Sequence, residues 1–238
     1  MTPEQSVQIK NLILRSLPKQ DYRDLFHSAS PCEIPLGRIL YHSGEEARYA
    51  YFPNNGVVSL LHSIESGDMI EVGLVGSEGM IGLPIVLGGG EETNNALVQI
   101  KGHAVRVSAD ILKNEFNKGG KLQKLLLRYT NLRMECLGRT VACNRLHTVD
   151  QRLAKWLAMM QERSGSNSFS ITQETMSRML GVRRSGVTVA AGDLQRAKLI
   201  RYSRGKIDIM NIPGLEAAAC ECLADFRQKT SNFIRELD

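Results

Sequence analysis

A chain of 238 residues is longer than one compact domain usually needs, so two domains are expected. Hydrophobic residues make up 42% of it and charged residues 23%, a balance that excludes an intrinsically disordered chain. It has neither a signal-type start nor a run of about 18 apolar residues, so we expect a cytoplasmic protein without a membrane partner.

Positive charge is concentrated in the second half of the chain. Residues 1–120 contain 10 Lys/Arg and 14 Asp/Glu, whereas residues 121–238 contain 20 and 11. A basic half joined to a mildly acidic half indicates that one of the two domains binds a polyanion. The alternative is that the basic residues form only a solvated face.

The first half reads as a helix followed by short strands. After an expected helix at about residues 3–29, apolar runs alternate with Gly- or Asn-containing turns between residues 32 and 107. Their length, β-branched content and spacing predict a small antiparallel barrel or jelly roll.

A long helix is expected after the break at Asn117-Lys-Gly-Gly. Apolar side chains there recur at the a/d spacing of a helix that packs on a partner helix. We therefore assign a dimer interface to Leu122, Leu125, Tyr129, Leu132, Cys136 and Cys143. The alternative is that this stripe packs on the β-roll of its own chain.

Residues 172–194, which follow a second expected helix from Thr148, have the pattern of a helix-turn-helix. Such a motif needs a small residue where its helices cross and a glycine in the turn, where a Cβ would resist the backbone angle. Ser177 and Gly181 fill these roles, and Thr172 can cap the first helix. The expected contacts between the helices are Met176, Leu180, Val182, Val187 and Ala190.

Exposed cations are expected at the start of the second helix, near Arg183, where side chains reach base edges in the major groove. Arg184 is the first candidate for guanine, whose O6 and N7 an arginine can bridge. Two short strands around residues 203–206 predict a wing whose cations meet phosphates. DNA contacts are assigned to Thr172, Gln173, Arg178, Arg183, Arg184, Ser185, Thr188, Arg201, Arg204 and Lys206. The alternative is a pair of helix arginines without a target.

With these elements in this order, the whole chain resembles the catabolite-activator and fumarate-nitrate-regulator (CRP/FNR) family. The most specific matches are VDQRLAKWL at residues 149–157 and the segment from Ile171-Thr-Gln-Glu to Leu180-Gly-Val-Arg-Arg, while GSEGMIG at residues 76–82 matches more loosely. The resemblance implies an α+β fold with a cyclic-nucleotide-binding-type β-roll (jelly roll) in residues 1–118, a dimerisation helix in 119–146 and a winged helix-turn-helix in 147–238. It also implies a transcription regulator, not an enzyme, that binds a palindromic operator in double-stranded DNA as a homodimer. RNA polymerase is a further candidate partner.

The nucleotide pocket departs from the family pattern. Members that bind cyclic AMP place an arginine at the end of the phosphate loop, where this chain has Asn94, which offers no charge and no guanidinium fork. We therefore expect no tight binding of cyclic AMP and control by another signal. The alternative is a constitutive regulator whose β-roll is only a structural platform. The candidate effector residues are Glu78, Gly79, Met80, Thr93, Asn94 and Asn95.

No cofactor or metal is predicted. An iron-sulfur cluster needs several thiolates in one place, and only Cys32 precedes Cys136. Cys220 and Cys222, two apart on an expected C-terminal helix, should point to different faces and not chelate together. No His-x-His pair supports a catalytic metal in the barrel, which argues against an enzyme. A haem ligand is left open among His27, His42, His62, His103 and His147.

Overall fold

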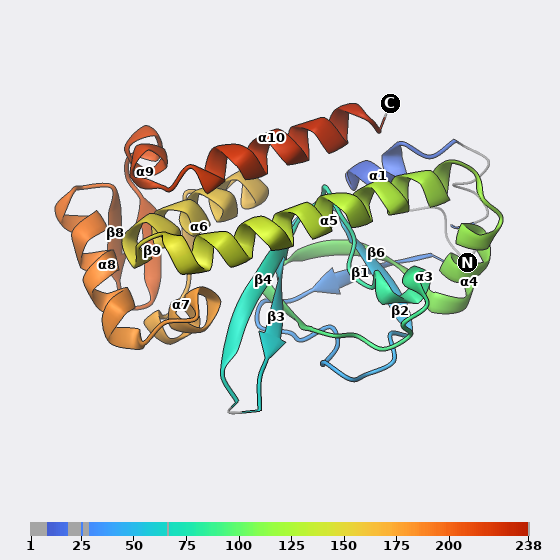
Figure 1. Ribbon diagram of the computed structural model, residues 1–238, viewed down its shortest axis with the longest axis horizontal. Helices are drawn as coiled ribbons and strands as arrows, with labels where there is room; N and C mark the ends of the chain where they lie inside the picture. Colours follow the sequence, from blue (N-terminus) through green and yellow to red (C-terminus); the bar gives the residue numbers. More distant parts are fainter. Residues whose placement is uncertain (1–8, 19–24, 26–28, 66, 238) are drawn as a thin grey trace, which may run out of the picture.

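The computed structural model describes residues 9–18, 25, 29–65 and 67–237 (Figure 1). Most of the expected first helix and His27 therefore lie outside the described residues, which retain the short helix α1 (Leu12–Arg15). Asn11 caps α1 by accepting from the backbone N–H of Leu14, and its amide nitrogen donates to the carbonyl oxygen of Gly79 at 2.7 Å. This contact attaches the start of the chain to the domain that follows.

Two three-stranded antiparallel sheets form the N-terminal β-roll. One sheet has the order β1 (Ser30–Ile34), β6 (Gly102–Ser108) and β2 (Tyr49–Pro53), and the other has β4 (Met69–Val75), β3 (Val57–Ser63) and β5 (Asn95–Ile100). In the second sheet Val58 lies opposite both Val75 and Val98, and all three side chains are buried. β-branched residues fit such a half-buried pleated surface, and the expected jelly-roll class is confirmed.

Glycines turn the chain from the β-roll into a long helix. Helix α3 (Pro84–Leu87) lies between β4 and β5, and α4 (Ala109–Asn117) follows β6. Gly119 and Gly120 then have φ angles of +81° and +86°, which residues with a Cβ rarely adopt. They start α5 (Gly120–Leu146), which has 27 residues.

The C-terminal elements form a winged helix-turn-helix with two further helices. Helix α6 (Val149–Ser164) leads to α7 (Gln173–Leu180) and α8 (Arg184–Arg196), beside a sheet of β7 (Ser168–Ser170), β9 (Lys206–Ile209) and β8 (Ile200–Ser203). After α9 (Ile212–Ala218), α10 (Cys222–Arg235) returns alongside α5 and packs on it (Figure 1). None of the helices in the described ranges is both long and apolar enough to cross a membrane.

Helix α5 turns the predicted dimer stripe inward. Its six side chains are at most 8% exposed within the single chain. Tyr129, for example, donates to the carbonyl oxygen of Met80 and packs against Phe233 of α10, with ring centroids 5.8 Å apart. The assignment of a dimer interface to Leu122, Leu125, Tyr129, Leu132, Cys136 and Cys143 is therefore wrong, because the same chain already covers these residues.

A second apolar stripe on α5 faces solvent. The exposed fractions are 49% for Leu127, 68% for Met134, 45% for Leu137 and 64% for Val141. Residues 127, 134 and 141 are seven apart and Leu137 lies at the intervening d position, so these four side chains share one face of the helix. This is the face that α5 presents outside its own chain.

Candidate nucleic-acid interface

The helix-turn-helix is built by local contacts. The hydroxyl oxygen of Thr172 accepts from the backbone N–H of Thr175 at 3.0 Å, which caps α7. Gly181 ends α7 with a φ of +59°, and α8 begins three residues later. The helices are held together by side chains that are at most 6% exposed: Met176, Ser177, Leu180, Val187 and Ala190. Val182 is half-buried beside them.

The N-terminal end of α8 presents cations to solvent. Arg183 is the N-cap residue, and Arg183, Arg184, Ser185 and Thr188 are all exposed. Within the described ranges, no acidic side chain forms an ion pair with either arginine. Their guanidinium groups are therefore available to an anionic partner.

Residues of α7 flank this end. The hydroxyl of Thr188 donates to Oε1 of Gln173 at 3.0 Å, which connects the two helices at the predicted DNA-facing surface. Arg178 is exposed but forms an ion pair with Glu174 at 3.3 Å. An exposed pair of this kind is weak, so it leaves Arg178 able to exchange partners.

The wing is a β-hairpin with a two-residue loop. Ser203 and Lys206 are paired across β8 and β9, which leaves Arg204 and Gly205 as the loop. Their φ angles of +49° and +75° match a type I′ turn, whose twist suits the two strands. Arg204 thus stands exposed at the tip.

The other two wing cations share one carboxylate. Arg201 and Lys206 lie 3.0 Å and 3.4 Å from the carboxylate oxygens of Asp208. A hydrogen bond from Ser168 and the two cations lower the pKa of Asp208. Arg204 has no such acidic partner among the described residues, so it is the cation of the wing most open to a phosphate.

Close packing and polar contacts hold the helix-turn-helix and helix α6 against the β-roll. Helix α7 packs on β4, where a Cβ at Gly181 would come within 2.6 Å of Ile70 Cδ1. Trp156 Nε1 of α6 lies 3.1 Å from both carboxylate oxygens of Glu71, which also accepts from Ser59 at 2.6 Å. Burial raises the pKa of Glu71 despite these hydrogen bonds.

The six predicted effector residues have two different environments. Glu78 forms a largely buried ion pair with Arg163 of α6 at 2.9 Å, and Gly79 lies directly against the Tyr129 ring. Asn94 instead lies 3.1 Å from His62 Nδ1, and Asn95 donates to Ser63 at 2.8 Å. Glu78, Gly79 and Met80 therefore belong to the joint between the β-roll and helices α5 and α6, whereas Thr93, Asn94 and Asn95 belong to the edge near the β3–β4 hairpin.

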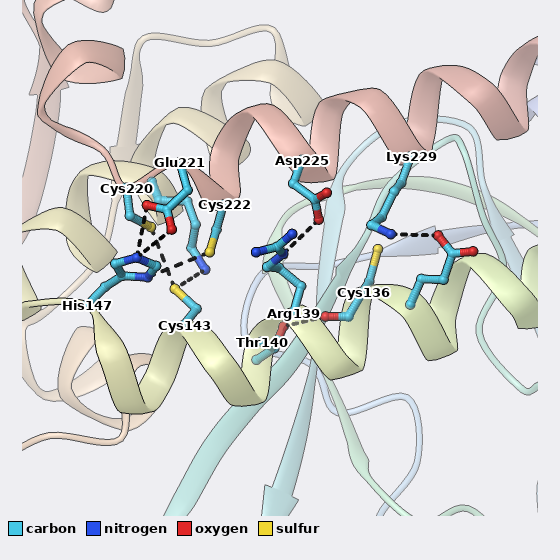
Figure 2. A network of polar contacts seen from close by, with 12 residues as sticks. Cys136, Arg139, Thr140, Cys143, His147, Cys220, Glu221, Cys222, Asp225 and Lys229 are labelled. Carbon is cyan, nitrogen blue, oxygen red and sulfur yellow. Dashed lines mark hydrogen bonds and ion pairs between the residues drawn. The ribbon is translucent and has the colours of Figure 1, made fainter.

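Two features of the structure were not predicted from the sequence, namely the exposed stripe of α5 and a cluster of cysteines. The exposed stripe of α5 has a seven-residue repeat that the sequence contains, but a neighbouring apolar stripe obscured it. Cys220 and Cys222 were expected on one helix and on different faces, which is wrong because α10 begins only at Cys222 and Cys220 precedes it in the link from α9. Their thiols instead converge with the thiol of Cys143 on α5 and the imidazole of His147 (Figure 2).

Comparison with known proteins connects this geometry to two family models. Residues 31–118 match the cyclic nucleotide-binding domain, and residues 151–218 match the Crp-like helix-turn-helix domain. Together the matches cover more than half of the chain. No curated protein sequence matches the chain.

Solved structures share the fold over most of the chain. A regulator assigned to the CRP/FNR family from Eubacterium rectale aligns with a TM-score of 0.71 and 18% identity, covering 87% of this chain and 96% of that one. FixK2 from Bradyrhizobium japonicum gives 0.68 and 16%, covering 81% and 98%. The c-di-GMP-responsive regulator CLP from Xanthomonas campestris gives 0.67 and 12%, covering 81% and 99%. One model matches the β-roll, the other matches the winged helix-turn-helix, and the long helix lies between them, so the chain belongs to the CRP/FNR family of transcription regulators.

Proposed function

We propose that the protein binds a palindromic operator in double-stranded DNA as a homodimer and responds to a signal other than cyclic AMP. The observation that carries this proposal is a group of exposed arginines on the start of α8 and the tip of the wing, Arg183, Arg184 and Arg204, which have no acidic partner in the part of the chain that the structure describes. Phosphates and guanine edges are the partners that such guanidinium groups recognise.

The two sets of cations would have different roles. Arg184 begins α8, and an arginine there can bridge O6 and N7 of guanine in the major groove. Arg201, Arg204 and Lys206 would contact phosphates beside the groove, which gives affinity without reading sequence.

The dimer would form through the exposed stripe of α5. Leu127, Met134, Leu137 and Val141 lie on one helix face, and water contact of such a face is unfavourable. A second copy of the same helix would cover it in a parallel coiled coil. Two recognition helices would then lie about 34 Å apart and meet successive major grooves.

The effector would not be cyclic AMP. Asn94 carries no charge, and its amide groups already contact His62 and Thr93. Arg163, which contacts the predicted pocket residue Glu78, forms an ion pair with this carboxylate. Calorimetry with cyclic AMP should therefore detect no micromolar binding, and an affinity in that range would contradict the proposal.

A constitutive regulator is the second candidate. It is favoured by the same contacts, because Thr93, Asn94 and Asn95 already bond to the protein itself and need no ligand. Operator affinity measured in cell extract and in defined buffer separates the two candidates. Equal operator affinity in extract and in buffer would support the constitutive regulator, whose β-roll is only a structural platform.

Selection of bound fragments from a random duplex library at fixed salt tests DNA recognition. We expect inverted repeats whose half-site centres are about one helical turn apart. Enrichment of single, unpaired half-sites would contradict the homodimer, and no enrichment at all would contradict sequence-specific binding.

Sedimentation of a Met134→Glu, Val141→Glu variant tests the dimer. A buried pair of like charges should dissociate it into single chains. Met210→Glu is the matched control, because Met210 is 58% exposed but lies in the winged domain away from α5. A dimer that survives the double substitution would show that another face is used.

A further inference from the structure

Four metal-binding side chains meet where α5 ends and α10 begins. Cys143, His147, Cys220 and Cys222 each offer one ligand atom, and these atoms all lie within 4.8 Å of one another (Figure 2). The Sγ atoms of Cys143 and Cys220 are 3.6 Å apart, and Sγ of Cys222 lies 3.6 Å from Nδ1 of His147. None of these residues is used by the proposed DNA contacts.

The separations fit a tetrahedral metal site. Zn–S bonds of about 2.3 Å and Zn–N bonds of about 2.0 Å place neighbouring ligands about 3.5–3.8 Å apart. Three thiols with one imidazole form a common donor set for structural zinc, whereas magnesium and calcium prefer oxygen ligands. The separation between the Cys143 and Cys220 sulfurs and that between the Cys222 sulfur and His147 Nδ1, both 3.6 Å, therefore require little adjustment on binding.

The backbone brings the ligands together from two segments. Cys143 lies in the last turn of α5, and His147 is the C-cap residue that directly follows this helix. Cys220 lies in the short link between α9 and α10, and Cys222 is the first residue of α10. The three cysteines are buried and the His147 side chain is 14% exposed, so the site is closed, with four protein ligands.

The surrounding charges suit a bound cation with three thiolates. Nε2 of His147 lies 2.9 Å from a carboxylate oxygen of Glu221, which leaves Nδ1 directed at the sulfurs. Such carboxylate contacts orient metal-binding histidines. The ammonium group of the buried Lys155 donates to Sγ of Cys143 at 3.2 Å, and its charge offsets the excess of three thiolates over one divalent cation.

We propose that Cys143, His147, Cys220 and Cys222 bind one Zn²⁺ ion per chain. The ion would join the end of the long helix to the helices that follow the wing. Because α5 carries the proposed dimer face and α9 packs on α6, this link would fix the orientation of the helix-turn-helix relative to the dimer axis. The effect on the orientation of the helix-turn-helix rests on the proposed function, whereas metal binding does not.

Metal analysis of the full chain, purified under reducing conditions without chelator, tests the site. We expect about one zinc per chain, and a cobalt-substituted protein with the visible d–d bands of tetrahedral Co²⁺ and a thiolate-to-cobalt charge-transfer band. Cys220→Ser and Cys222→Ser together should abolish both signals, and Cys32→Ser, outside the cluster, should retain them. Absence of metal together with absence of the charge-transfer band would overturn the proposal.

A measurement on the unchanged chain covers the case in which the double variant does not fold. Titration of the thiols with an organomercurial should release one zinc per chain, detected with a chromogenic chelator. Zinc that stays bound after all five thiols have reacted would overturn the assigned ligands, and so would a Cys32→Ser variant that has no zinc to release.

Operator binding by zinc-loaded and chelator-stripped protein tests the link. We expect at least tenfold weaker binding after stripping and recovery on adding Zn²⁺. Equal binding would overturn the proposed effect on orientation. If neither form binds any duplex, the proposed function fails, while the metal analysis still decides the site.

Discussion

The winged helix-turn-helix and the joint between the β-roll and helix α6 use charged groups in opposite ways. In the wing and at the start of α8, Arg183, Arg184 and Arg204 are exposed and have no acidic partner among the residues described. In the joint, the side chains of Arg163 and Glu78 are only 14% and 13% exposed and are bonded to each other. An exposed cation costs folding little, whereas a buried charge must be paired. The first region is thus suited to recognition and the second to holding the domains in place.

The largest effect is expected from Arg163→Ala. Glu78 would be left buried without its partner, and breaking a buried pair in this way costs about 3–5 kcal/mol of the free energy of unfolding. Urea denaturation followed by circular dichroism measures this value. Adding Glu78→Gln should recover part of the loss, because the uncompensated charge is removed.

The matched control is Arg196→Ala. Arg196 forms an ion pair with Asp193, but its side chain is 74% exposed. The free energy of unfolding should fall by less than about 0.5 kcal/mol. If both alanine variants lose the same amount, burial is not what distinguishes the two regions.

A pH dependence should separate a buried carboxyl from the exposed charges. Glu92 is 6% exposed in the β-roll, and burial raises its pKa to about 7. The folded chain therefore holds this proton more tightly than the unfolded chain, so its contribution to stability is fully present below the ordinary pKa of about 4.5 and is lost as the pH rises through about 7. Between about pH 5 and 8 the free energy of unfolding should fall by about 2–3 kcal/mol relative to Glu92→Gln.

The comparison with Glu92→Gln removes the contributions of other titrating groups, because both proteins share them. The amide resembles the protonated carboxyl and does not titrate. Parallel stability curves for the two proteins across this pH range would contradict a raised pKa for Glu92.

The two regions also differ in how far the sequence predicts them. The helix-turn-helix depends on local features, such as the Thr172 cap and the Gly181 turn, and both are found as expected. Helix α5 has two apolar stripes, and the sequence contains no information on which stripe α10 covers. The separate environments of Glu78, which contacts Arg163, and Asn94, which contacts His62, likewise depend on the packing of the whole β-roll. Cys220 was misplaced because helix boundaries are uncertain by a few residues, and those residues decide where a thiol points.

The next effect is expected on DNA affinity rather than on the free energy of unfolding. Arg184→Ala should weaken binding to the selected operator by about 1–3 kcal/mol, because one bridging contact to guanine is lost. Binding to random duplex should stay almost unchanged. Fluorescence anisotropy with both duplexes at one salt concentration measures the difference, and equal losses on the two would refute base recognition by Arg184.

The smallest effect is expected from Arg204→Ala at the wing tip. Loss of one phosphate contact should weaken operator and random duplex alike, and should reduce the slope of log K against log salt by about 0.9. Arg201→Ala is the matched comparison, because the same residue type lies on the same hairpin but is engaged by Asp208 at 3.0 Å. DNA would have to compete with that carboxylate for Arg201, so its removal should change the salt slope less than removal of Arg204. A larger change for Arg201 would mean that pairing within the chain does not decide which cations meet DNA, and the contrast between exposed and engaged charges would then not extend to the wing.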